Sequence, residues 1–469
     1  MTFSRTWLNV SLLALALSGC SMIPDYQRPD NPSPLPEQQD ASEQLTAVDI
    51  GWRDFYQDEP LQQLIGLSLN NNRNLQATAL MVEQLRAQYR IRRAERLPML
   101  DGQGGYSRQR FSANANEFGQ SGIFEEYSVG VGIPSWEIDF FGRLDSLEQA
   151  ALSEYLSQEA TLKSTQLTLV SEVADAYLSW QASLAQLGLA ESTRKAREES
   201  YRLIERRYEG GLSSELALRQ AETALHEARI AEAEFQQQAN QNFTLLELLV
   251  GQPLNKADYQ AQWQTATLLR KLPDNLQSDA LLQRPDVAAA ELNIKAANAN
   301  IGAARAAFFP RISLTSSLGL AATTPANLLE SSSRTWQIAP QFSIPLIDWG
   351  INDANLDVAE LQKEISVVRY QEVIQTAFKE VFDELQARQT LEDQLTAQQD
   401  LTKATARSLE LAEKRFDAGV DSYLEVLDAQ RSLIDAQLAE IATDLARLRN
   451  QLTLYKALGG GLLEQTRTP

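Results

Sequence analysis

The sequence repeats itself, and this internal duplication constrains the fold more than any other feature of the chain. Residues 206–251 and 414–459 align without a gap, and Gly211 falls opposite Gly419. The match continues upstream and shares glycine and proline positions, which argues against chance similarity between two coiled coils. The chain is therefore a tandem duplication of a unit of about 210 residues. We expect each half to run helix, strand, loop, strand, long helix, turn and helix.

The longest predicted helices are nearly free of helix-breaking residues. Segments 143–208 and 351–416 contain no proline, and Gly188 is their only glycine. At a rise of 1.5 Å per residue, each helix would be about 100 Å long. Such a helix cannot bury its apolar side within one globule. We therefore expect it to pack against others, in a coiled coil or a helical barrel.

The segments between the helices alternate apolar residues with small or polar ones. This period of two is clear in residues 127–133, 311–320 and 335–346, and weaker in 100–111. Each run has roughly the length of a tilted transmembrane β-strand, although a soluble hairpin with one buried face is the alternative. In lipid, four strands would need other copies of the chain to close their open edges. Three copies would give twelve strands, and two copies would give eight.

The N-terminus has the pattern of a secretory signal. Arg5 precedes an apolar run at residues 7–17, which is too short to cross a bilayer. The run ends in Leu17-Ser18-Gly19-Cys20, which resembles a bacterial lipobox, and a chance cysteine is the alternative. We expect a signal peptide at 1–19 and a lipid on Cys20. Ser21 follows the cysteine, as in lipoproteins that are released to the outer membrane rather than retained at the inner one.

Composition excludes several classes of function. With 42 Lys+Arg against 62 Asp+Glu, the net charge of -20 argues against a nucleic-acid binder. One Cys and one His exclude Cys-rich metal sites and two-His motifs. There is no phosphate-binding Gly-x4-Gly-Lys motif. We therefore predict no enzyme activity, no catalytic residues, no metal and no cofactor besides the covalent N-terminal lipid.

Five motifs stand out in the sequence. They are Leu-Leu-Gln-Arg-Pro-Asp-Val at 281–287, Phe-Phe-Pro-Arg-Ile-Ser-Leu at 308–314, Ile-Asp-Trp-Gly at 347–350, the run from Arg415 to Arg431, and Leu-Tyr-Lys-Ala-Leu-Gly-Gly-Gly at 454–461. On these motifs the chain resembles the outer membrane factors, of the TolC/OprM type, that belong to tripartite efflux pumps, and the resemblance covers residues 52–461. The lipobox fits the lipoprotein branch, which serves RND multidrug efflux systems.

The resemblance implies a mainly α fold with a membrane β part. Three copies would build a 12-stranded β-barrel in the outer membrane and a 12-helix α-barrel that extends into the periplasm. The homotrimer would contact outer membrane lipid, a periplasmic adaptor protein and an inner membrane RND-type pump. It would conduct drugs or other small toxic compounds passively to the outside. Two alternatives remain: the exit duct of a type I protein secretion system, and a structural coiled-coil lipoprotein without a pore.

The duplication and the resemblance together predict the organisation of the chain. An extended, lipid-anchored segment follows the signal peptide, and an equatorial linker separates the two repeats. The predicted boundaries are 1–19 signal peptide, 20–57 N-terminal segment, 58–251 first repeat with a hairpin at 99–136 and a tip turn at 209–213, 252–276 linker, 277–461 second repeat with a hairpin at 310–346 and a tip turn at 417–422, and 462–469 tail.

The two turns between long helices are the predicted tips. Their glycines suit a residue with positive φ, which ends one helix and lets the next begin. The resemblance implies that the tips and the flanking Arg-aromatic pairs meet the adaptor, and simple turn chemistry is the alternative. The predicted contact residues are Arg207, Tyr208, Gly211, Arg415, Phe416 and Gly419.

The residues after the second turn are the predicted periplasmic gate. Their spacing of three, four and three places them on one helical face, and the first repeat has only uncharged residues at the matching positions. The resemblance implies a constriction here, with rings of acids and leucines from three copies, and acid rings favour cations. We expect the arginine to pair with an acid on a neighbouring helix. A solvated charged face is the alternative. The residues are Asp421, Leu424, Asp428 and Arg431.

Overall fold

The computed structural model forms two compact units, each built from both repeats. It describes residues 21–30, 47–115, 121–259, 263, 268–270, 272 and 281–466. The predicted signal peptide and Cys20 lie outside the described residues, as does nearly half of the predicted linker. The described segments of unit 1 fall within 1–30, 81–159 and 289–371, and those of unit 2 within 31–80, 160–288 and 372–469.

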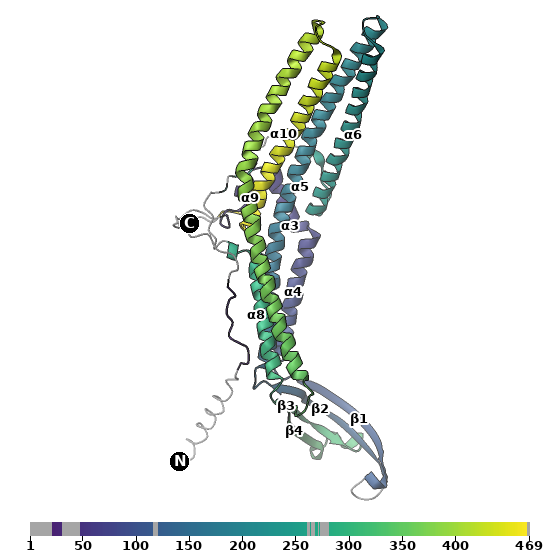
Figure 1. The fold of residues 1–469 in the computed structure, drawn as a ribbon. Coiled ribbons are helices and arrows are strands. Elements are labelled where there is room, and N and C mark those ends of the chain that lie inside the picture. Colours follow the sequence, from purple (N-terminus) through teal and green to yellow (C-terminus); the bar gives the residue numbers. More distant parts are fainter. Residues whose placement is uncertain are drawn as a thin grey trace. The chain divides into compact units, whose positions relative to one another are not determined.

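A four-stranded antiparallel sheet dominates unit 1. Its order is β1-β2-β3-β4, so each repeat contributes one hairpin, and the β2–β3 pairing joins the two repeats (Figure 1). Gly130 and Gly319 face each other in this pairing; a Cβ on Gly130 would lie 2.7 Å from the Leu318 carbonyl oxygen. The strand bounds are β1 Asp101–Phe111, β2 Gly122–Ile138, β3 Arg311–Ala322 and β4 Arg334–Ser343.

Strands β2 and β4 each depart from the predicted alternation near a proline. Strand β2 is longer than the predicted 127–133, and it continues past an irregularity in register between Ile133 and Trp136. Pro134 lies at that irregularity, where a missing N–H is tolerated. Strand β4 stops at Ser343, before the predicted end at Leu346, because Pro345 cannot donate to the ladder.

Apolar side chains remain exposed along the sheet. Val131, Leu318 and Trp336, on three adjacent strands, lie in register with one another, and their exposed fractions are 48%, 63% and 72%. Alternate apolar positions thus present an apolar face that the described chain leaves uncovered. Large exposed apolar patches in a folded chain mark contact with a membrane or another protein.

The two predicted long helices are confirmed. Helix α5 (Arg143–Glu209) and helix α9 (Ile351–Asp417) each run for 67 residues. Each is capped by an aspartate: Asp139 accepts from the N–H groups of Arg143 and Asp145, and Asp348 accepts from those of Gly350 and Asn352. The equivalent capping confirms that the duplication extends to the start of both helices.

The remaining helices complete the bundles. In unit 2, α6 and α10 lie beside the later parts of α5 and α9 (Figure 1). No described helix is both long and apolar enough to cross a membrane. The bounds are α2 Trp52–Phe55, α3 Glu59–Asn71, α4 Arg73–Ala94, α6 Glu215–Val250, α8 Pro285–Ala306 and α10 Tyr423–Ala457.

Aromatic side chains form the largest core of unit 2. Phe55 stacks on Tyr455 with ring centroids 3.8 Å apart, and the Tyr455 hydroxyl donates to the Ile50 carbonyl oxygen over 2.6 Å. Trp180 and Tyr177 of α5 are fully buried in the same cluster. The N-terminal part of the chain is thereby packed against both repeats.

Candidate gate and adaptor-docking tips

Both tip turns are built in the same way. Gly211 and Gly419 have φ angles of +73° and +71°, as the sequence predicts. The N–H of Leu212 donates to the Arg207 carbonyl oxygen over 2.7 Å, and the N–H of Val420 donates to that of Arg415 over 2.9 Å. This is the Schellman arrangement, in which a left-handed residue satisfies the last helical carbonyls.

An aromatic cluster connects the two tips. The Arg207 guanidinium lies over the Phe416 ring, 5.0 Å from its centroid, and the Phe416 and Tyr423 centroids are 5.6 Å apart. Ile204 of α5 and Leu218 of α6 are buried in the same small core. The two Arg-aromatic pairs therefore differ: Arg207 and Phe416 belong to this joint between the repeats, whereas Tyr208 is 40% exposed.

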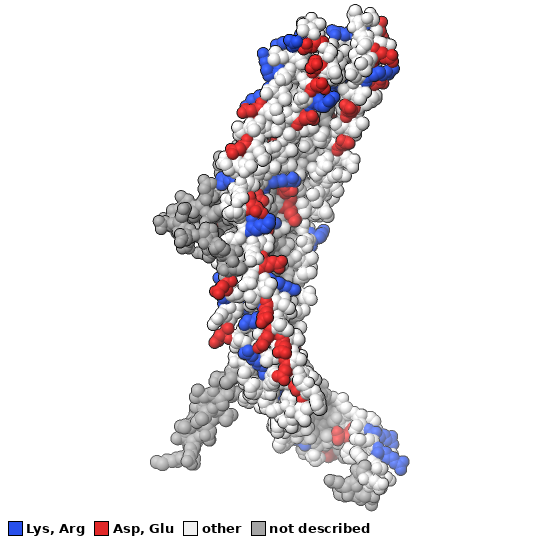
Figure 2. Space-filling view, viewed as in Figure 1, with Lys and Arg blue, Asp and Glu red and all other residues white. Residues whose placement is uncertain are grey.

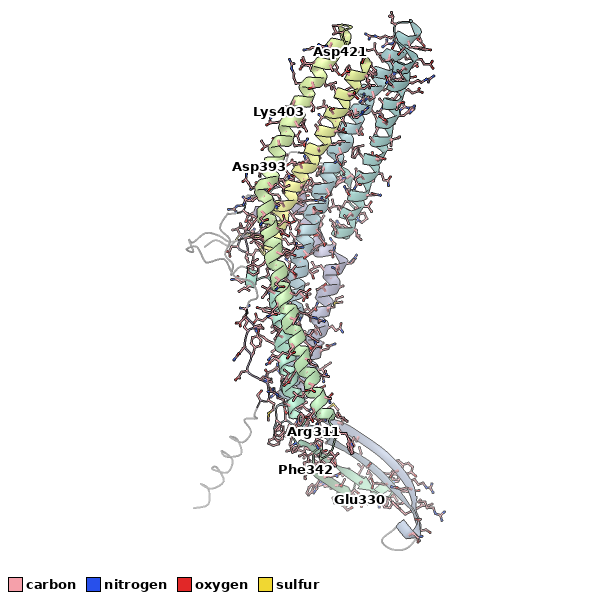
Figure 3. The ribbon with its side chains drawn as sticks, viewed as in Figure 1. Arg311, Glu330, Phe342, Asp393, Lys403 and Asp421 are labelled. Carbon is pink, nitrogen blue, oxygen red and sulfur yellow. The ribbon has the colours of Figure 1, made fainter. Side chains whose placement is uncertain are left out.

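Asp421 is held by an arginine of the preceding helix. Arg415 donates from Nε and Nη2 to the two carboxylate oxygens of Asp421, over 2.5 and 2.8 Å. This pairing holds the pKa of the Asp421 carboxyl below its usual value. Figure 3 places Asp421 at the turn between α9 and α10. Because α10 begins at Tyr423, Asp421 precedes the helix, so the prediction that it shares a helical face with Leu424 was wrong.

The other three predicted gate residues lie in the first turns of α10. Leu424 is 44% exposed, and the exposed side chains of Asp428 and Arg431 approach each other to 3.5 Å. In the described chain, Arg431 therefore forms an ion pair with an acid of its own helix rather than with an acid on a neighbouring helix. The i, i+3 spacing of the two residues accounts for this pairing.

Charge is mixed around the tips. On the visible face, Lys and Arg lie interspersed with Asp and Glu near both turns, without a block of one sign (Figure 2). No group of three or more His, Cys, Asp or Glu residues that could hold a metal ion occurs among the described residues. The local chemistry at the tips is thus that of ion pairs and apolar contacts.

Arg284 is a buried residue whose role the sequence reasoning missed. It is 8% exposed, and its guanidinium contacts the carboxylates of Asp286 and Glu380, each at 2.8 Å. It also donates to the carbonyl oxygen of Ala457 over 2.9 Å. The Arg-Pro-Asp run within 281–287 therefore serves to join α8, α9 and α10. The sequence feature that points to this role is the pair Arg284 and Asp286 on either side of Pro285, in a segment with no other charged residue.

The match to a known protein family also falls into two parts, one for each repeat. The family model described as outer membrane efflux protein matches residues 64–252 and 276–460, one range for each repeat. The chain belongs to this family. The predicted fold class, efflux channel function and outer membrane location are thereby confirmed. An outer membrane efflux protein of this type works as a trimer with a periplasmic adaptor and an inner membrane pump.

Similar members of the outer membrane efflux protein family cover nearly the whole chain. A toluene efflux pump outer membrane protein of Pseudomonas putida is 44% identical over 99% of this chain and 97% of its own length. The cation efflux system protein CusC of Escherichia coli O157:H7 is 42% identical over 96% and 97%. The open-state MtrE outer membrane channel of Neisseria gonorrhoeae matches with a TM-score of 0.85 at 36% identity, over 96% of this chain and 100% of that one.

Proposed function

We propose that this efflux protein is a passive duct that performs no catalysis and is gated at its periplasmic tip by Leu424 and Asp428. The observation that carries this proposal is their position. Both residues lie on exposed parts of the first turns of α10, directly after the tip turn. Three copies would place three leucines and three carboxylates at one level. A leucine ring obstructs water, and an acid ring attracts cations.

The asymmetry of the repeats supports the assignment to α10 rather than α6. At the positions of Leu424, Asp428 and Arg431, the first repeat has Leu216, Gln220 and Thr223. Only the second helix pair therefore supplies charge to the constriction.

We infer that the tips dock the adaptor through the parts of the turns that remain exposed. Leu212 and Val420, at the Schellman turns, are 83% and 64% exposed. Four of the predicted contact residues instead support the turns: Arg207, Gly211, Phe416 and Gly419. A fifth, Arg415, is paired with Asp421. Among the predicted contact residues, Tyr208 therefore offers the most accessible apolar surface for a partner. Cross-linking of an adaptor to a cysteine placed at Leu212 would test this assignment.

We propose that the cargo is a set of small toxic organic compounds. Relatives of this chain are named for toluene, solvent and antibiotic efflux, all at 43–44% identity. A second candidate is metal cations, because one relative at 42% identity is named a cation efflux system protein. Deletion of the gene followed by susceptibility tests with solvents, antibiotics and metal salts separates the two. Sensitivity to metal salts alone would overturn the first candidate.

We also propose that Cys20 carries the lipid anchor. The lipobox sequence supports this, since the cysteine is the only one in the chain. Several acyl chains on one residue give stable membrane attachment. Mass spectrometry of the purified protein tests it: the mature N-terminus should begin at Cys20 with added acyl mass. An unmodified Cys20, or a chain that still carries residues 1–19, would contradict the proposal.

Planar-bilayer recording tests the duct itself. The full-length trimer should conduct in discrete steps, and conductance should rise when the gate is weakened by Leu424→Ala. A matched control is Leu216→Ala, the same change at the equivalent position of the first repeat. A rod-like lipoprotein would give no conductance in any variant. Equal effects of the two substitutions would remove Leu424 from the gate.

A further inference from the structure

A cavity lies behind the tip turns in unit 2. Its volume is about 490 Å³, and it is bounded by α5, α6 and α10. Its lining contains both apolar and charged side chains. The apolar lining comes from Leu216, Ala224, Ala228, Ala231, Leu424, Leu427 and Ile434, and the polar lining from Thr193, Arg197, Arg219, Gln220, Thr223, Glu227, Arg431 and Asp435.

Arg197 is the unusual residue of this cavity. Its exposed fraction is 8%, and it donates from Nη1 to the side-chain oxygen of Gln430. No carboxylate among the described residues lies within ion-pair distance of its guanidinium. Burial lowers the pKa of Arg197, interaction with the Tyr423 hydroxyl raises it, the charge of Arg431 lowers it, and the charge of Glu227, which is not in ion-pair contact, raises it. A buried cation without a counter-ion is costly.

Arg284 shows what a compensated buried arginine looks like in the same unit. It has the same exposed fraction as Arg197, yet carboxylates of Asp286 and Glu380 lie 2.8 Å from it. Arg197 is as buried as Arg284 but has no carboxylate of the described chain in contact with its guanidinium. That guanidinium is therefore able to pair with an anion that enters the cavity.

We propose that this cavity binds an organic anion with an apolar body. Its carboxylate or sulfonate would accept hydrogen bonds from Arg197 and Arg431, since a guanidinium can donate two parallel hydrogen bonds to two oxygens of one oxyanion. Its apolar body would contact Leu427 and Ile434. The volume falls within the range of small-molecule pockets, which combine an apolar lining with a few polar anchors.

The site changes the expected selectivity of the duct entrance. A ring of Asp428 carboxylates favours cations, whereas this cavity, next to the same helix, would retain amphipathic anions. Leu424 and Arg431 line the cavity, so an occupant contacts the helix that we assign to the gate. Binding itself does not rest on the proposed gating function, because the cavity and the arginine are present in a single chain.

A pair of matched dyes tests the proposal. The full-length protein in lipid nanodiscs would be titrated with 8-anilinonaphthalene-1-sulfonate and with N-phenyl-1-naphthylamine, which lacks the sulfonate, and signals from empty nanodiscs would be subtracted. We expect saturable binding of one sulfonate dye per chain and a dissociation constant raised about tenfold or more by Arg197→Gln. The neutral dye should bind more weakly and should not respond to Arg197→Gln.

Two further variants keep the test decisive. Arg202→Gln is the matched control, because Arg202 lies on the same helix but is exposed and paired with Glu198. Ala231→Phe fills the cavity while it leaves Arg197 in place, so it should also weaken sulfonate binding. The proposal is overturned if the sulfonate dye binds Arg197→Gln and Ala231→Phe as it binds the wild type, or if both dyes bind the wild type equally.

Discussion

The guanidinium of Arg284 donates a hydrogen bond to the carbonyl oxygen of Ala457 over 2.9 Å. At the equivalent place in the first repeat, the side-chain amide of Asn72 donates to the carbonyl oxygen of Leu249 over 2.8 Å. Each donor stands just before a helix, α8 or α4, and each acceptor lies at the end of the last long helix of its repeat. The duplication has therefore kept a contact while it changed the chemistry that makes it.

This difference predicts unequal costs of removing the two donors. Arg284→Ala leaves Asp286 and Glu380 without their buried partner, so we expect a loss of about 3 kcal/mol in unfolding free energy. Asn72→Ala removes uncharged hydrogen bonds, and we expect about 1 kcal/mol. Urea unfolding of the detergent-solubilised protein, followed by circular dichroism, measures both. Equal losses would show that the carboxylates of the second repeat add nothing.

Much of the fold could be predicted from local pattern. The long helices follow from the absence of proline between residues 143 and 208 and between 351 and 416, and the tip conformation follows from Gly211 and Gly419. These features depend on neighbours in sequence. A helix propensity or a positive φ acts within a few residues, so one sequence is enough to find it.

The ion pairs could not be predicted in this way. Periodicity predicts that Asp421 lies on the helical face of Leu424. However, α10 begins only at Tyr423, and the Asp421 carboxylate accepts a hydrogen bond from Arg415 of the preceding helix. The burial of Arg197 depends on contact with α10, more than two hundred residues away in the chain. Periodicity reports the face of one helix and carries no information about which distant helix covers it.

The tip glycines should tolerate no branched side chain. Gly419→Val places a β-branched residue at a φ of +71°, so we expect a loss of about 1–2 kcal/mol. Gly188→Ala is the comparison, because Gly188 lies inside helix α5 and has no positive φ. Its Cβ would meet nothing within 4 Å, so alanine should stabilise the helix by about 0.5–1 kcal/mol. Thermal melting of both variants tests the prediction, and opposite shifts are expected.

The second tip turn should resist mild acid. The Asp421 carboxylate has its pKa lowered below 3.8 by hydrogen bonds from Arg415, so its contribution is present above that pH and is lost as pH falls through the lowered pKa. Amide exchange at the turn, corrected for intrinsic rates, should be equal at pH 7 and pH 5. Asp421→Asn should speed exchange at both. Loosening of the wild-type turn at pH 5 would contradict this.

Charge removal at Asp428 should weaken cation preference in single-channel recordings. The side chain of Asp428 is 55% exposed, and its carboxylate lies 3.5 Å from the Arg431 guanidinium, so in a trimer the carboxylate would be available to passing ions. Asp428→Asn should therefore lower the cation-to-anion permeability ratio. Joint replacement of the neutral pair by Arg415→Gln and Asp421→Asn should leave the ratio unchanged, because that pair carries no net charge. Gln220→Asp, which adds an acid at the matching position of the first repeat, should raise the ratio. An unchanged ratio in Asp428→Asn would show that the narrowest point lies elsewhere, since a ring of three carboxylates at a constriction cannot be removed without altering the local potential.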